Sequence, residues 1–145
     1  MILKNNVMIS LKSITFQNGE KEETELFTKA IYNRQRNTYT FQYEDTSATG
    51  FEGSVTTIII NGNDSASITR EGTANTNIML ETNKKHFCHY GTPYGDFQIG
   101  VMTHFIKNNI DTSGELALKY TLDLNSAYLS DNEIIIKIQN FSQNQ

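Results

Sequence analysis

The sequence predicts an all-β protein, with one antiparallel up-and-down β-barrel of about eight to ten strands covering residues 1–145. The clearest observation is segment 115–124, in which apolar and polar residues alternate strictly, as in a strand with one buried and one exposed face. One-sided strands are typical of antiparallel sheets. Similar segments recur at short spacing, and the single proline of the chain leaves few forced breaks in them. Closure into a barrel would pair the two edge strands.

The N-terminal part of the chain contains one clear strand and one ambiguous segment. The clear strand spans 7–16, and the Asn18-Gly19 pair that follows it favours a tight hairpin turn. Segment 22–32 fits a helix as well as a strand, because its apolar residues match both a helical stripe and a short strand. The residue pattern leaves both alternatives open.

The rest of the chain reads as a series of short strands joined by turns rich in Gly, Asn and Asp. The further expected strands are 38–44, 55–60, 65–71, 75–82, 86–92, 97–106, 115–124 and 133–139. Segment 45–54 is polar and contains glycine, so we expect a loop there, and 130–132 is expected to form a turn. Alternation in 97–106 places Thr103 and Phe105 on the same face of that strand.

Composition and charge exclude several classes of protein. The formal net charge of −4 argues against a nucleic-acid partner, which needs a concentrated basic face. The N-terminus lacks the pattern of a secretory signal, and no apolar stretch is long enough to span a membrane as a helix. Cys88 is the only cysteine, so an internal disulfide is impossible. We therefore expect a cytoplasmic protein.

Several segments resemble elements of a known family. Residues 70–72 resemble an Arg-x-Gly element at a strand end, and 90–95 resemble a Tyr-x-Thr-Pro-Tyr-Gly element. Segment 114–138 is similar to a pair of strands joined by a Ser-x-Asn turn, and the aromatic strand that ends at 43–44 is also similar. Together these motifs resemble the YwiB-like family, a bacterial domain of unknown function with a calycin-like (lipocalin-type) β-barrel.

The resemblance implies that segment 22–32 is a strand and that the chain forms one calycin-like barrel. It supplies no catalytic residue and no cofactor. The chain contains no tryptophan, so it lacks the Gly-x-Trp signature of lipocalins proper, and the resemblance does not extend to secreted carriers.

Arg70 is the most informative candidate for a ligand contact. By parity it shares a strand face with Ala66 and Ile68, so it points inward if they do. A buried guanidinium needs a partner, because an isolated interior charge is very costly. In one alternative the side chain anchors the anionic head group of a ligand through its bidentate fork. In the other it pairs internally with Asp45 or Glu44, or reaches water at the rim, and internal pairing is the commoner arrangement.

A second group of residues is expected to shape turns rather than to bind. These structural residues are Gly72, Thr92, Pro93, Tyr94 and Gly95. Pro93 fixes φ, and Gly95 adopts conformations that other residues avoid. The alternative is that 92–95 form a lip over the mouth of a barrel.

Three residues of the types that can bind metals or act as nucleophiles lie close together in the sequence: His86, Cys88 and His89. On a strand the first two share a face and His89 points the other way, which divides the set, and His104 lies on a later strand. We therefore expect no metal site. A nucleophilic Cys88 would need a lowered pKa and a base within reach, and no sequence pattern supplies them.

The leading functional hypothesis is a non-enzymatic barrel that needs no cofactor and holds a small apolar or amphipathic ligand. The expected lining residues are Arg70, Tyr39, Phe41, Tyr43, Thr103 and Tyr120. The alternatives are a filled barrel that acts through its outer surface as a protein-interaction or regulatory module, and an enzyme that uses Cys88 or His89. A ligand carrier predicts an internal cavity of roughly a few hundred Å³ and an Arg70 without a carboxylate partner, whereas a filled barrel predicts no cavity and a paired Arg70.

Overall fold

The computed structural model describes residues 2–73, 75–92 and 95–139; the side chains of 2–5, 89–92 and 95–96 are outside this description. The chain forms strands β1 (Ile2–Gln17), β2 (Glu20–Gln35), β3 (Thr38–Glu44), β4 (Val55–Asn61), β5 (Ser65–Glu71), β6 (Asn75–Glu81), β7 (Lys85–Thr92), β8 (Gly95–Asn109), β9 (Glu115–Leu124) and β10 (Ala127–Ile138). A four-residue helix, α1 (Ile110–Ser113), joins β8 to β9.

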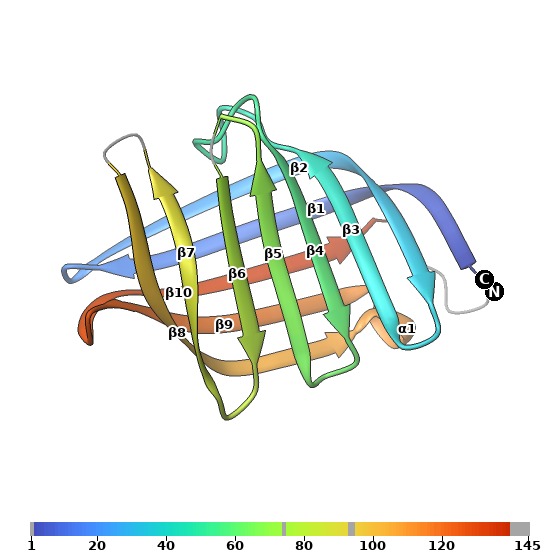
Figure 1. The fold of residues 1–145 in the computed structure, drawn as a ribbon. Coiled ribbons are helices and arrows are strands. Elements are labelled where there is room, and N and C mark those ends of the chain that lie inside the picture. The colour runs from blue at the N-terminus through green and yellow to red at the C-terminus, as the bar shows by residue number, and fades with distance from the viewer. Residues whose placement is uncertain (1, 74, 93–94, 140–145) are drawn as a thin grey trace.

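Every strand pairs in antiparallel fashion with its neighbours in the sequence, and β1 also pairs with β10, so the sheet closes into a barrel. This confirms the expected all-β up-and-down barrel. It also confirms that segment 22–32 is a strand, since it lies within β2 (Figure 1). Strands β3 to β7 run across strands β1, β9 and β10 in Figure 1, so the barrel is flattened into two crossing layers. The buried core lies between these layers.

Two expectations about strand boundaries and faces were wrong. Strand β10 begins at Ala127, so 130–132 lie inside a strand and do not form the expected turn. In β8 the register shifts between Thr103 and Phe105, which marks a β-bulge, and the bulge reverses the facing of the residues after it. Phe105 is therefore only half-buried, while Ile106 enters the core in its place.

One end of the barrel is closed by α1. Ile110 is 1% exposed and fills this end of the core. Asp111 accepts hydrogen bonds from the hydroxyl of Tyr39 (2.7 Å) and from Nη1 of Arg34 (2.6 Å), which ties the helix to β2 and β3. The helix thus forms a floor, and open space inside the barrel lies toward the opposite end.

Strand pairing is incomplete at the junction of β6 and β7, where only Asn75 and Thr76 find partners on β7. Two inward side chains accept hydrogen bonds from the backbone of β6 where the ladder is missing. Cys88 Sγ accepts from the N–H of Met79 (3.3 Å), and Thr103 Oγ1 accepts from the N–H of Glu81 (3.1 Å). Buried N–H groups are costly when unpaired, so these two side chains stabilise the gap.

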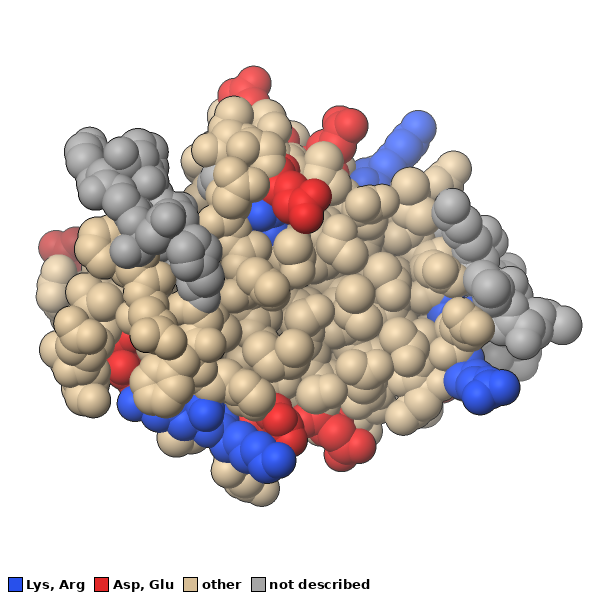
Figure 2. Space-filling model, in the orientation of Figure 1, with Lys and Arg blue, Asp and Glu red and all other residues tan. Residues whose placement is uncertain are grey.

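The face of the barrel seen in Figure 2 is largely uncharged over its centre, and the lysine, arginine and acidic side chains lie mainly at its edges. No basic patch covers this face. No helix in the described part of the chain combines the length and the apolar character that a membrane crossing would require.

Candidate functional site

A cavity of about 510 Å³ opens at the end of the barrel away from α1. Its walls come from both layers: β1, β2, β9 and β10 on one side and the end of β3, β5, β6 and the start of β8 on the other, with the 45–54 loop at its edge. The buried part of the wall combines aliphatic side chains, among them Ile68, Ile78, Ile99 and Leu122, with the hydroxyl-bearing Tyr43, Tyr120, Thr76 and Ser130. This volume lies within the range of small-molecule sites in proteins, roughly 300–1,000 Å³.

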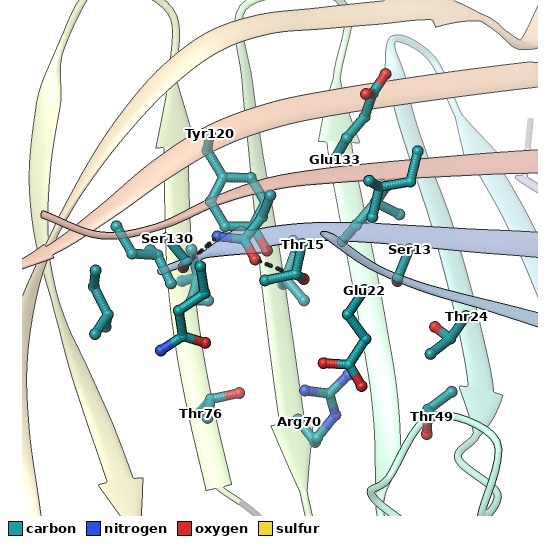
Figure 3. A pocket seen from close by; sticks show the side chains of 18 of the residues that line it. Ser13, Thr15, Glu22, Thr24, Thr49, Arg70, Thr76, Tyr120, Ser130 and Glu133 are labelled. Atoms are coloured by element: carbon teal, nitrogen blue, oxygen red, sulfur yellow. Dashed lines mark hydrogen bonds between the residues drawn. The ribbon is translucent and has the colours of Figure 1, made fainter. Parts of the chain in front are cut away.

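Arg70 projects into this cavity from β5 (Figure 3). By alternation along the strand it shares a face with the buried Ala66 and Ile68. Its Nε donates to Asp45 Oδ2 at 3.4 Å and to Thr56 Oγ1 at 3.0 Å. The guanidinium carbon lies 3.8 Å from the ring centroid of Phe51, within cation–π range. Its side chain is 17% exposed, so it is largely held in place by protein on two sides.

The Asp45 carboxylate fixes the position of the Arg70 guanidinium and of the Thr56 hydroxyl. This carboxylate is fully buried, at 0% exposure, and a charge there needs several donors to offset lost hydration. It accepts from the hydroxyls of Thr49 (3.0 Å) and Thr56 (2.6 Å) in addition to Arg70. Asp45 therefore acts as the fixed counter-ion of the cavity's arginine.

The ion pair leaves part of the guanidinium unused. Arginine carries five N–H donors, and the contacts to Asp45 and Thr56 use only the one on Nε. Within the described residues, no acceptor lies at hydrogen-bond distance from the two terminal nitrogens of Arg70. The structure thus combines features of both alternatives: an internal cavity, and an Arg70 with a carboxylate partner on one side only.

The backbone at position 72, two residues after Arg70, requires a glycine. The φ of Gly72 is +129°, and a Cβ at this position would lie 2.5 Å from the carbonyl oxygen of Gly53. The backbone at the end of β5 therefore packs directly against the 45–54 loop. Thr73 Oγ1 donates to the Glu52 carbonyl (2.8 Å) and lies 2.9 Å from Ser54 Oγ, which fastens the loop further. This close packing positions both Asp45 and Phe51 at Arg70.

A polar group on the opposite wall escaped the sequence reasoning. Asn132 Nδ2 donates to Ser130 Oγ (2.9 Å), and Asn132 Oδ1 accepts from Thr15 Oγ1 (3.1 Å), as the dashed lines in Figure 3 show. The sequence pattern predicts a turn at 130–132, whereas the structure has a strand there. A bulge between Tyr128 and Ser130 brings Leu129 to the cavity as well. The available signal was the alternation of Ser130, Asn132 and the isoleucines that follow.

The residues expected to line a ligand site divide into two sets. Arg70, Tyr43 and Tyr120 are in the cavity wall. Tyr39 and Phe41 lie nearer the floor, where Tyr39 bonds Asp111 and the Phe41 ring packs 5.0 Å from that of Tyr32. The Thr103 hydroxyl bonds the backbone of β6 and is also outside the wall. Parity placed these three side chains inside the barrel but could not separate its packed end from its hollow one.

Burial determines the protonation of the tyrosine at the cavity wall. The Tyr43 side chain is 5% exposed, and this burial, with the nearby Asp45 carboxylate, raises the pKa of its hydroxyl well above the usual value of 10.0. Tyr43 therefore remains a neutral donor and acceptor at physiological pH.

The residues expected to shape turns lie partly outside the described chain. Thr92 pairs with Gly95 across the ends of β7 and β8, while Pro93 and Tyr94 fall outside the described residues.

The cysteine and histidine residues do not converge. Cys88 is 7% exposed and bonds the backbone of Met79, His86 Nε2 lies 2.9 Å from Glu81 Oε1, and His104 bonds Thr121 on the outer surface. The His89 side chain is outside the description. Among the residues described, no group of three or more His, Cys, Asp or Glu side chains is arranged to hold a metal ion.

The fold and the sequence together place this ten-stranded antiparallel barrel in a family: the chain belongs to the domain of unknown function DUF1934, whose sequence profile matches residues 9–136. No curated protein sequence matches the chain significantly. Among solved structures, the crystal structure of the ywiB protein from Bacillus subtilis is similar, with a TM-score of 0.72, 16% identity and 94% of each chain covered. These findings confirm the expected relationship to the YwiB-like family, and the structural likeness shows a shared fold.

Proposed function

We propose that this protein is a non-enzymatic barrel that binds a small, largely apolar ligand in its interior, with Arg70 orienting the polar end of that ligand. The observation that carries the proposal is a guanidinium held by a buried carboxylate, with both terminal nitrogens unpartnered among the described residues, at the wall of a cavity of about 510 Å³. A binding site needs both space and a fixed polar contact, and Arg70 provides the contact.

The proposed binding energy comes mainly from the aliphatic wall. Burying apolar surface contributes about 25 cal/mol per Å², so contact with Ile68, Ile78, Ile99 and Leu122 would supply most of the affinity. Arg70 and Tyr43 would fix orientation, because their donors have limited freedom of movement. A cavity inside an up-and-down barrel is also the arrangement expected of a calycin-like carrier, and it supports that part of the expectation.

The arrangement of Cys88 supports a protein that is not an enzyme. Its sulfur accepts a backbone hydrogen bond at the β6–β7 junction, so it has a structural use, and it is buried. The proposal also places the protein in the cytoplasm, where a lone buried thiol stays reduced.

The Arg70–Asp45 ion pair favours a second candidate function. A paired arginine is what a filled structural barrel predicts, and such a barrel would act through its outer surface as a protein-interaction module. Phe27 on β2 and Phe87 on β7, which are 63% and 64% exposed, are the most exposed large apolar side chains in the described part and would contribute to such a surface.

Native mass spectrometry of the protein purified from its own cells distinguishes the two candidates. We expect the wild-type protein to retain a small molecule and the Arg70→Met, Asp45→Asn double variant to lose it or hold it less tightly. The double variant removes both charges, so no unpaired carboxylate is left buried. Arg36→Met, at an exposed position in the β2–β3 turn, is the matched control and should behave as wild type. A clean apo mass for wild type, with a protein partner captured through Phe27 or Phe87, would contradict the carrier and support the interaction module.

A further inference from the structure

The charges around the cavity are unequal in number. Arg70 is the only lysine or arginine in the described wall, and Asp45 at 3.4 Å already neutralises it. Glu22 of β2 adds a second carboxylate. It pairs in register with Thr15 of β1, which also lines the cavity, and it is exposed, which places it at the mouth. In Figure 3 the Glu22 side chain points toward the Arg70 side chain, whereas Glu133, which also lines the cavity, points away from Arg70.

Glu22 forms no ion pair with any described residue, and one positive group in the site therefore meets two negative ones. A ligand carboxylate would gain hydrogen bonds from the Arg70 terminal nitrogens, but it would enter a region whose net charge has the same sign. Because the site is partly shielded from water, repulsion from the Glu22 and Asp45 carboxylates raises the free energy of a negatively charged ligand bound there. A ligand ammonium would meet the opposite difficulty at the guanidinium.

The hydrogen-bonding capacity of the cavity also favours an uncharged ligand group. The terminal nitrogens of Arg70 only donate, the Glu22 carboxylate only accepts, and Tyr43 and the hydroxyl groups of the opposite wall do both. A ligand group that accepts and donates while carrying no charge satisfies Arg70 and Glu22 together. A carboxylate satisfies only Arg70, and an ammonium satisfies only Glu22.

We propose that the polar end of the ligand is an uncharged group bearing both an acceptor and a donor, of which a primary amide is the simplest example, and that Glu22 is the residue that selects against an acid. This inference rests on the proposed function, since it concerns the same cavity.

The test uses a matched series of probes with one alkyl chain: octanamide, octanoate and octylamine. Isothermal titration calorimetry at neutral pH measures the affinity of each for the full chain. We expect octanamide to bind about tenfold more tightly than octanoate, equivalent to about 1.4 kcal/mol, with octylamine also weaker than the amide. Glu22→Gln should reduce the preference for amide over acid. Glu25→Gln, which makes the same change on the outward face of β2, is the matched control and should leave the preference unchanged.

The outcomes separate the inference from the function on which it rests. Octanoate or octylamine binding as tightly as octanamide, or a Glu22→Gln preference equal to wild type, would overturn the inference while leaving a ligand-binding barrel. Failure of all three probes to bind wild type would overturn the proposed function and the inference with it. Urea unfolding checks that both variants are folded. We expect both to be about as stable as wild type, because Glu22 is exposed and its replacement removes no buried contact.

Discussion

Gly72 and Gly53 touch backbone to backbone, so closely that a Cβ on Gly72 would lie 2.5 Å from the carbonyl oxygen of Gly53. This contact carries the 45–54 loop against β5 and sets Asp45 and Phe51 on either side of Arg70. In the Arg-x-Gly element, Arg70 is the residue that would bind a ligand. Gly72 is the residue that allows the 45–54 loop to pack against β5 and support Arg70.

Gly72→Ala is expected to destabilise the protein and to weaken probe binding. The substitution combines an unfavourable φ of +129° with a clash against backbone, and the neighbouring chain can relieve the clash only by moving the loop. We expect a loss of about 2–4 kcal/mol in the free energy of unfolding by urea titration. Gly19→Ala is the control: its φ is +76° but nothing lies within 4 Å of its Cβ, so it should cost only about 1–2 kcal/mol. Equal losses at both positions would contradict the loop-packing argument.

The Asp45–Arg70 pair should show strong coupling in a double-mutant cycle. Arg70→Met alone leaves a fully buried carboxylate with only two hydroxyl donors, and we expect it to cost about 3–5 kcal/mol of stability. Adding Asp45→Asn removes that unpaired charge, so the double variant should be less destabilised than the sum of the single variants by about 1–3 kcal/mol. Urea unfolding of the four proteins measures the difference. Additive losses would show that the carboxylate does not depend on Arg70.

The successes and errors of the sequence reasoning have physical causes. Period-two alternation predicts strands and faces well wherever pairing is regular, as it is in 115–124. It fails after Thr103, because one extra residue in β8 reverses the facing of Phe105, and neighbouring strands decide where such a residue is placed. Segment 22–32 needed the family resemblance, because local pattern alone supports either structure.

The candidate site was only partly accessible from sequence for a similar reason. Parity identifies Arg70 and Tyr43 as inward residues, but depth within the barrel depends on which end α1 closes, so Tyr39 and Phe41 could not be separated from the cavity wall. Asp45 and Glu44 were both possible partners of Arg70 from the sequence. That Asp45 is the partner depends on the contact between the 45–54 loop and Gly72. These relationships are non-local, and no short window of sequence contains them.

High pH should destabilise the protein through Tyr32. Burial raises the pKa of its hydroxyl from 10.0 to about 12, with a contribution from the Asp111 carboxylate. Between these values the unfolded chain releases the proton and the folded chain retains it, so the free energy of unfolding falls as pH rises from 10 to 12. Tyr32→Phe keeps the ring packed 5.0 Å from Phe41 and should reduce this fall. Thermal melts across this pH range measure it; identical slopes for wild type and variant would contradict the assignment.

Thr103 should be important for stability because of its hydroxyl rather than its size. Its Oγ1 accepts from the N–H of Glu81 where β6 lacks a partner on β7, and the side chain is 5% exposed. Thr103→Val keeps the shape but leaves that N–H unsatisfied, so we expect a loss of about 1–3 kcal/mol in urea unfolding. Thr103→Ser retains the acceptor and should lose less, with the amide of Glu81 still protected from hydrogen exchange. If the valine variant were as stable as wild type and its Glu81 amide equally protected, the hydroxyl would not be closing the gap between β6 and β7.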